Sequence, residues 1–98
     1  MARKVRLTKR TDTKLDNILI HLNKEFVVTT VDRFLKRLYS FFDIIIEFPQ
    51  IGALNDGEKG IYGFVLEKQV RVFYRFTEKE VVIINFFETR RDPKNKSN

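Results

Sequence analysis

The chain has 98 residues, 43% of them hydrophobic, so we expect one domain spanning residues 1–98 around one hydrophobic core. It has no cysteine, which excludes disulfides, thiolate nucleophiles and zinc-thiolate sites, and it has no apolar run typical of a membrane span or secretory signal, so we expect a cytoplasmic location. The formal charge of +6 favours an anionic partner, but charge alone does not choose between nucleic acid, an acidic protein and a membrane surface.

A strand and a helix are the first expected elements. Residues 3–8 alternate charged and apolar side chains, which predicts a short strand. From Leu15 to Phe26, apolar residues recur every three or four positions, as one face of a helix requires. Residues 11–13 (Thr-Asp-Thr) precede this series with N-capping side chains, so we expect the helix to begin there.

A second helix and a loop follow. After a β-branched interruption over residues 27–30, the helical spacing resumes at Val31 and ends near Glu47, because Pro49 pushes the residue before it out of the helical region. The link between the helices is short, so we expect an antiparallel helical hairpin that a sheet must cover. Residues 49–60 are rich in glycine, asparagine and aspartate, which predicts a mobile surface loop.

Three stretches of β-branched and aromatic residues predict three successive antiparallel strands. They span residues 61–66, 70–76 and 81–87. The polar residues 77–80 predict a hairpin loop, and counting outward from it places Phe76 opposite Val81 and Arg71 opposite Phe86. The predicted fold is therefore α+β in the order β-α-α-β-β-β, with the helical hairpin packed on a small antiparallel sheet. Residues 92–98 are charged and aperiodic, so we expect a flexible tail there.

Few side chains are candidates for catalysis. The only serines are Ser40 and Ser97, and no cysteine is present, so we expect neither a serine nor a thiol enzyme. His21 is the one histidine, and there is no second histidine to complete a metal site with it. We interpret it as a structural residue and expect neither a metal nor a cofactor.

Cations are expected to gather on one face of the sheet. Alternation along residues 70–76 sends Arg71, Phe73 and Arg75 to the same face, and the Arg90–Arg91 pair follows the last strand at the end nearest Arg71. Arginines can hold phosphate oxygens, and aromatic rings between them can stack on a base. The candidate phosphate-binding or partner-binding residues are Lys68, Arg71, Phe73, Arg75, Phe86, Arg90 and Arg91. Alternatively, arginines on an exposed strand only keep the sheet soluble.

The order of the predicted elements, together with three motifs, resembles the RelE/ParE superfamily of toxins from type II toxin-antitoxin systems, the plasmid-stabilisation or addiction modules. The motifs are Phe48–Gly52 (FPQIG), Val70–Phe76 (VRVFYRF) and Arg90–Pro93 (RRDP). The resemblance covers nearly the whole chain. It implies a toxin that inhibits growth until a cognate antitoxin neutralises it.

In RelE-type members the toxin is a ribosome-dependent mRNA endoribonuclease. The resemblance matches Arg71 and Arg91 to two functional arginines of that branch, which would bind and stabilise the reacting phosphate. The nuclease pattern also has two lysines on the preceding strand, where this chain has residues 62–65 (YGFV), and a tail tyrosine, where it has residues 94–98 (KNKSN). These departures argue against RNA cleavage.

ParE-type members lack that catalytic set and poison DNA gyrase. The loop at residues 49–52 and the Arg-Asp-Pro ending are closer to this branch, so we favour a gyrase-directed toxin. One alternative is an endoribonuclease whose base is Lys68 or Glu67, and another is a relic that only binds its antitoxin. In each case the resemblance implies an acidic, amphipathic antitoxin, which suits the charge of +6. We expect no cofactor and no membrane partner.

Overall fold

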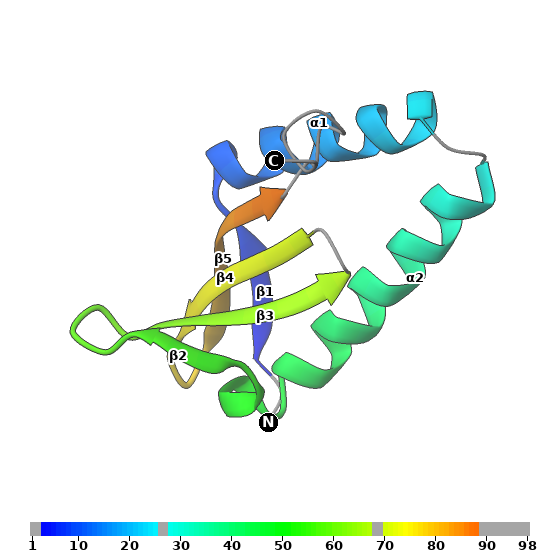
Figure 1. The fold of residues 1–98 in the computed structure, drawn as a ribbon. Coiled ribbons are helices and arrows are strands. Elements are labelled where there is room, and N and C mark those ends of the chain that lie inside the picture. The colour runs from blue at the N-terminus through cyan, green and yellow to red at the C-terminus, as the bar shows by residue number, and fades with distance from the viewer. Residues whose placement is uncertain (1–2, 26–27, 68–69, 89–98) are drawn as a thin grey trace.

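Figure 1 shows the computed structural model of the chain, which describes residues 3–25, 28–67 and 70–88. Its elements are β1 (Lys4–Leu7), α1 (Lys9–Glu25), α2 (Val28–Ile45), the 3-10 turn η1 (Pro49–Ile51), β2 (Ala53–Asp56), β3 (Ile61–Glu67), β4 (Val70–Phe76) and β5 (Glu80–Glu88). The strands form one five-stranded sheet in the order β1-β5-β4-β3-β2, with β1 parallel to β5 and the other pairs antiparallel. The predicted α+β class is confirmed.

The predicted loop over residues 49–60 is wrong in part, because it contains η1 and the strand β2. β2 pairs with β3 through Ala53 opposite Gly63 and Leu54 opposite Tyr62. Its four residues, Ala-Leu-Asn-Asp, include no β-branched or aromatic side chain, so strand propensity gave no sign of it. Pairing with the neighbouring strand, rather than local preference, makes this segment extended.

Both helices begin earlier than predicted. The N-cap of α1 is Thr8, whose Oγ1 accepts a hydrogen bond from the backbone N–H of Thr11 at 3.1 Å, so residues 11–13 lie inside the helix. α2 already begins at Val28, within the β-branched stretch expected to interrupt it. Because β-branched residues cost a helix only a fraction of a kcal/mol each, packing of the rest of the helix overrides them.

Both helices cover the same face of the sheet, and the hydrophobic core lies between the helices and this face. α2 buries four side chains at a spacing of three or four residues, Phe34, Leu38, Phe41 and Ile45, against the sheet residues of the same cluster. In Figure 1, α1 and α2 approach each other where α1 ends and α2 begins, and they diverge toward the sheet. None of the helices in the described part of the chain is long and apolar enough to cross a membrane.

The pairing of β4 with β5 follows the predicted register only near the turn. Phe76 lies opposite Val81 as expected, but a bulge farther along adds one residue to β5. Arg71 therefore lies opposite Phe87 and not, as the sequence predicted, opposite Phe86. Counting residues outward from the turn cannot detect such a bulge. The predicted faces of β4 itself are confirmed, since buried and more exposed side chains alternate along it.

Candidate functional site

The sheet face turned away from the helices is the first candidate. We call it the outer sheet face and define it by Val65, Arg71, Phe73, Arg75 and Phe87. Cross-strand pairing places Val65, Arg71 and Phe87 in one row across β3, β4 and β5. Val65 is 57% and Phe87 50% exposed, and both arginines are exposed. The surface is therefore basic, with apolar side chains between the charges.

Phe73 is half-buried because its ring lies over Gly63, its cross-strand partner. A Cβ atom at Gly63 would lie 3.1 Å from Phe73 Cε1, closer than an ordinary carbon contact. The missing side chain thus lets the aromatic ring lie down on β3. The middle of the outer sheet face therefore carries an aromatic ring packed against the backbone of β3.

The structure brings together only some of the predicted site residues. Arg71, Phe73 and Arg75 share the outer sheet face, as predicted. Phe86 does not, because the bulge in β5 turns it into the core, where it is 0% exposed, and Phe87 takes its place beside Arg71. The remaining predictions, Lys68, Arg90, Arg91 and the flexible tail over 92–98, lie outside the described residues.

The charges on this face differ in how far they are neutralised. Arg6 donates two hydrogen bonds to Glu80, from Nε to Oε1 at 3.0 Å and from Nη2 to Oε2 at 3.1 Å. The hydrogen bond from Arg6 is the main reason why the pKa of Glu80 is lowered, with smaller effects of the Arg6 and Arg75 charges. By contrast, Arg71 and Arg75 form no ion pair with residues 3–25, 28–67 or 70–88.

Among the described residues, the side chains across the strands from Arg71 are not groups that move protons. Its cross-strand neighbours are Val65 and Phe87, which cannot act as acid or base. Glu67, the alternative base, belongs to the helix side, where its Oε2 lies 2.8 Å from Arg37 Nε of α2. That oxygen is shielded from solvent and accepts no well-directed hydrogen bond, so the close charge of Arg37 is what compensates it.

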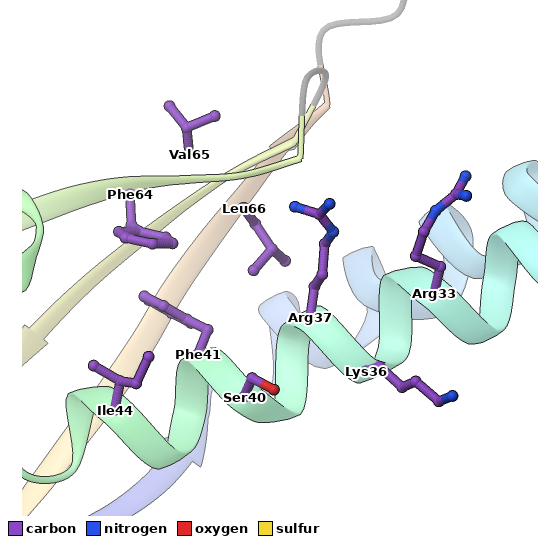
Figure 2. A pocket seen from close by; sticks show the side chains of 9 residues that line it. All are labelled: Arg33, Lys36, Arg37, Ser40, Phe41, Ile44, Phe64, Val65 and Leu66. Atoms are coloured by element: carbon purple, nitrogen blue, oxygen red, sulfur yellow. The ribbon is translucent and has the colours of Figure 1, made fainter.

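A second basic surface lies between α2 and β3, and sequence reasoning missed it. We call it the α2–β3 groove; its volume is about 350 Å³ (Figure 2). It is lined by Arg33, Lys36, Arg37, Ser40, Phe41, Ile44, Phe64, Val65 and Leu66. A signal was present in the sequence, because positions 33, 37, 40 and 44 repeat the spacing of the buried α2 stripe, shifted by one residue.

The FPQIG motif after α2 is held to the centre of the sheet by Tyr74. The Tyr74 hydroxyl donates to the Pro49 carbonyl at 2.7 Å and accepts from the Gly52 N–H at 3.0 Å. Gly52 fits because it lacks a side chain: a Cβ there would lie 2.6 Å from the hydroxyl. Burial raises the pKa of Tyr74 and keeps the phenol neutral. The motif therefore has a structural role in this chain.

Comparison with known proteins gives consistent results. The model of the family "ParE toxin of type II toxin-antitoxin system, parDE" matches residues 5–93. A chain of the chromosomal ParDE system from P. aeruginosa has a TM-score of 0.71 at 15% identity, over 91% of this chain and 98% of that one. A chain of the E. coli DinJ-YafQ toxin-antitoxin complex has a TM-score of 0.61 at 10% identity, over 90% and 93%. At such identities the likeness shows a shared fold. The search of curated proteins gives no significant match.

Proposed function

This chain belongs to the ParE toxin family of type II toxin-antitoxin systems, and from that premise we propose that it arrests growth by binding DNA gyrase rather than by cutting mRNA. The observation that carries the choice is the surrounding of Arg71. A nuclease needs a proton acceptor and a proton donor beside the reacting phosphate, whereas Arg71 is flanked across both neighbouring strands by Val65 and Phe87. Arginine itself stays protonated and is a poor base.

The position of Glu67 supports the same choice. A replacement base would have to reach the phosphate that Arg71 holds, but Glu67 is turned to the helix side and held by Arg37. The outer sheet face, with Arg71, Phe73 and Arg75, is still suited to binding an anionic surface without catalysing a reaction. We propose that the outer sheet face contacts gyrase or the DNA that gyrase carries, with Phe87 in the role first given to Phe86.

Neutralisation by an antitoxin completes the proposed function. Two solved structures with the same fold come from a ParDE system and from a DinJ-YafQ toxin-antitoxin complex. The charge of +6 favours an acidic partner for this chain as well. We propose an acidic antitoxin that binds tightly enough to keep the outer sheet face from its target.

The test is induced expression in a bacterial culture, with growth, mRNA integrity and plasmid supercoiling followed in the same cells. We expect growth arrest with changed supercoiling and intact mRNA. Arg71→Glu should relieve the arrest, and Arg91→Ala tests the second predicted arginine. Lys59→Glu is the matched control, because it reverses an exposed charge in the turn between β2 and β3.

Two other results would replace the proposal. Arrest with cleaved mRNA and unchanged supercoiling would establish the endoribonuclease alternative, with a base outside the described residues, such as Lys68. Normal growth of cells that accumulate the folded chain would leave a relic that only binds its antitoxin.

A further inference from the structure

Strand β3 has an open edge beside the α2–β3 groove. On one side β3 pairs with β4 along most of its length, from Tyr62 to Glu67. On the other side β2 pairs only with residues 61–63. Residues 64–67 therefore have no second strand neighbour in the described part of the sheet. Alternate residues of such an edge present unpaired N–H and C=O groups, to which an extended chain can bind.

The opposite wall of the groove is the flank of α2, and its chemistry changes along its length. Arg33, Lys36 and Arg37 lie toward the end where β3 finishes, since Arg37 is the partner of Glu67. Ile44, 41% exposed, lies at the other end, and Phe41 stacks on Phe64 with ring centroids 4.5 Å apart. The groove is thus basic at one end and apolar at the other.

Figure 2 shows how the side chains fill this space. Phe64 and Leu66 point from β3 toward α2, while Val65 points to the other side, as strand alternation requires. Arg33 and Arg37 rise from α2 toward the strand, and Lys36 extends away from it at the rim. No acidic residue lines the groove, and Arg33 and Lys36 make no ion pair within the parts of the chain described.

We propose that an extended acidic segment of the antitoxin binds in the α2–β3 groove as an added strand on the free edge of β3. The segment pairs with residues 64–67, which at about 3.3 Å per residue is a contact of about 13 Å. Its helix-facing side chains are apolar near Ile44 and acidic near Arg33 and Lys36. This inference rests on the proposed toxin function for the identity of the partner, but its geometry is independent of the toxin's target.

An extended segment fits better than a helix because β3 has an open edge. A helix brings no free backbone groups to β3, so the open edge would stay unpaired under it. Strand addition satisfies the edge and leaves alternate side chains to contact α2.

The experiment measures binding of defined peptides to the purified full-length chain by fluorescence anisotropy. The probe is Ser-Val-Ser-Val-Ser-Glu-Ser-Glu, tested with its reversed-order twin, because the edge alone does not set a parallel or antiparallel direction. We expect one of the two to bind with a Kd below about 1 mM. Methylation of alternate backbone nitrogens on that peptide should abolish binding, since it removes the strand hydrogen bonds and keeps the charge.

Variants of the chain locate the site. Arg33→Glu combined with Lys36→Glu should weaken peptide binding at least about tenfold, the equivalent of 1.4 kcal/mol. The matched control combines Arg71→Glu with Arg75→Glu, which makes the same change in net charge on the outer sheet face and should leave binding unchanged. Circular dichroism of each variant confirms that it is folded.

Several outcomes would overturn the inference. They are absence of binding by both peptides, equal binding of the methylated peptide, and equal loss in the two charge-reversed pairs, which would show unspecific attraction. Failure of the proposed function looks different. A chain that binds the peptide but leaves growth unaffected contradicts only toxicity, and a chain that arrests growth but does not bind the peptide contradicts only the groove.

Discussion

The outer sheet face and the α2–β3 groove are both basic, yet they differ in what they can bind. On the outer sheet face, Arg71 and Arg75 stand on a strand with an aromatic ring between them. In the groove, Arg33 and Lys36 stand beside a concave apolar floor and an unpaired strand edge. The outer sheet face can bind an anionic surface whether it belongs to a protein or a nucleic acid. The groove adds backbone hydrogen bonds that select an extended polypeptide.

The difference illustrates how the surroundings of a basic cluster limit what it can bind. The outer sheet face arises from alternation within one strand, so the residues of β4 alone define it. The groove arises because β2 stops pairing at Gly63 while β3 continues to Glu67, and because α2 happens to run past the part left open. Substitutions in β5, β4 and the loop after α2, together with a pH change, can test the geometry on which the two regions depend.

The largest expected effect distinguishes the two sides of β5. Phe86→Ala should lower the free energy of unfolding by about 3–5 kcal/mol, because it opens a cavity in the core. Phe87→Ala, one residue away on the outer sheet face, should change it by no more than about 0.5 kcal/mol. Urea denaturation of both variants measures the contrast. Similar losses at the two positions would mean that the bulge in β5 is misplaced.

The second effect concerns the anchor of the loop that follows α2. Tyr74→Phe should cost about 1–3 kcal/mol, because the Pro49 carbonyl and the Gly52 N–H lose a buried partner. Tyr62→Phe is the control. Tyr62 stacks on Tyr74, but its hydroxyl makes no hydrogen bond to the described residues. Thermal unfolding of the two variants decides the point. Equal stability of Tyr74→Phe and wild type would remove the structural role of the FPQIG motif.

A related substitution tests the same anchor from its other side. Gly52→Ala should also destabilise the chain, by about 1–3 kcal/mol, because the added Cβ would meet the Tyr74 hydroxyl and the Gly63 carbonyl oxygen. Gly57→Ala is the control, because a Cβ there would make only an ordinary contact with Leu54 at 3.8 Å. The midpoint of urea unfolding measures both. An unaffected Gly52→Ala variant would show that the loop can shift freely.

The smallest effect is the pH dependence of the Arg6–Glu80 pair. The hydrogen bond from Arg6 lowers the pKa of Glu80 below its ordinary value of 4.5, so the pair stabilises the fold at neutral pH. This contribution should be lost as the pH falls from 4.5 through the lowered pKa and Glu80 becomes protonated. Wild type should therefore exceed Glu80→Gln in stability at neutral pH and approach it in acid. A difference that persists in strong acid would exclude the ion pair as its source.

The elements that sequence reasoning placed well carry their information locally. β4 was predicted with its observed bounds, because β-branched and aromatic residues fill it and a polar turn follows. The segments it missed depend on neighbours. β2 has weak strand propensity and forms by pairing with β3, and the N-cap of α1 is one of three nearby threonines that only the fold distinguishes.

The candidate site divides in the same way. Period-two alternation placed Arg71, Phe73 and Arg75 correctly, because no step outside β4 was needed. Phe86 was misplaced because one extra residue in a bulge reverses every side chain beyond it. Helical spacing gave a signal for the α2 wall of the groove, but the groove as a whole could not be predicted, since it needs the relative placement of α2 and the free part of β3.

The most direct test adds the purified chain to DNA gyrase and relaxed plasmid, and compares wild type with the two charge-reversed pairs. We expect wild type and the Arg33→Glu and Lys36→Glu pair to inhibit supercoiling alike, and the Arg71→Glu and Arg75→Glu pair to inhibit about tenfold less, a difference of about 1.4 kcal/mol. Unhindered supercoiling with wild type, together with cleavage of mRNA on purified ribosomes, would contradict the proposal that this toxin acts by binding gyrase.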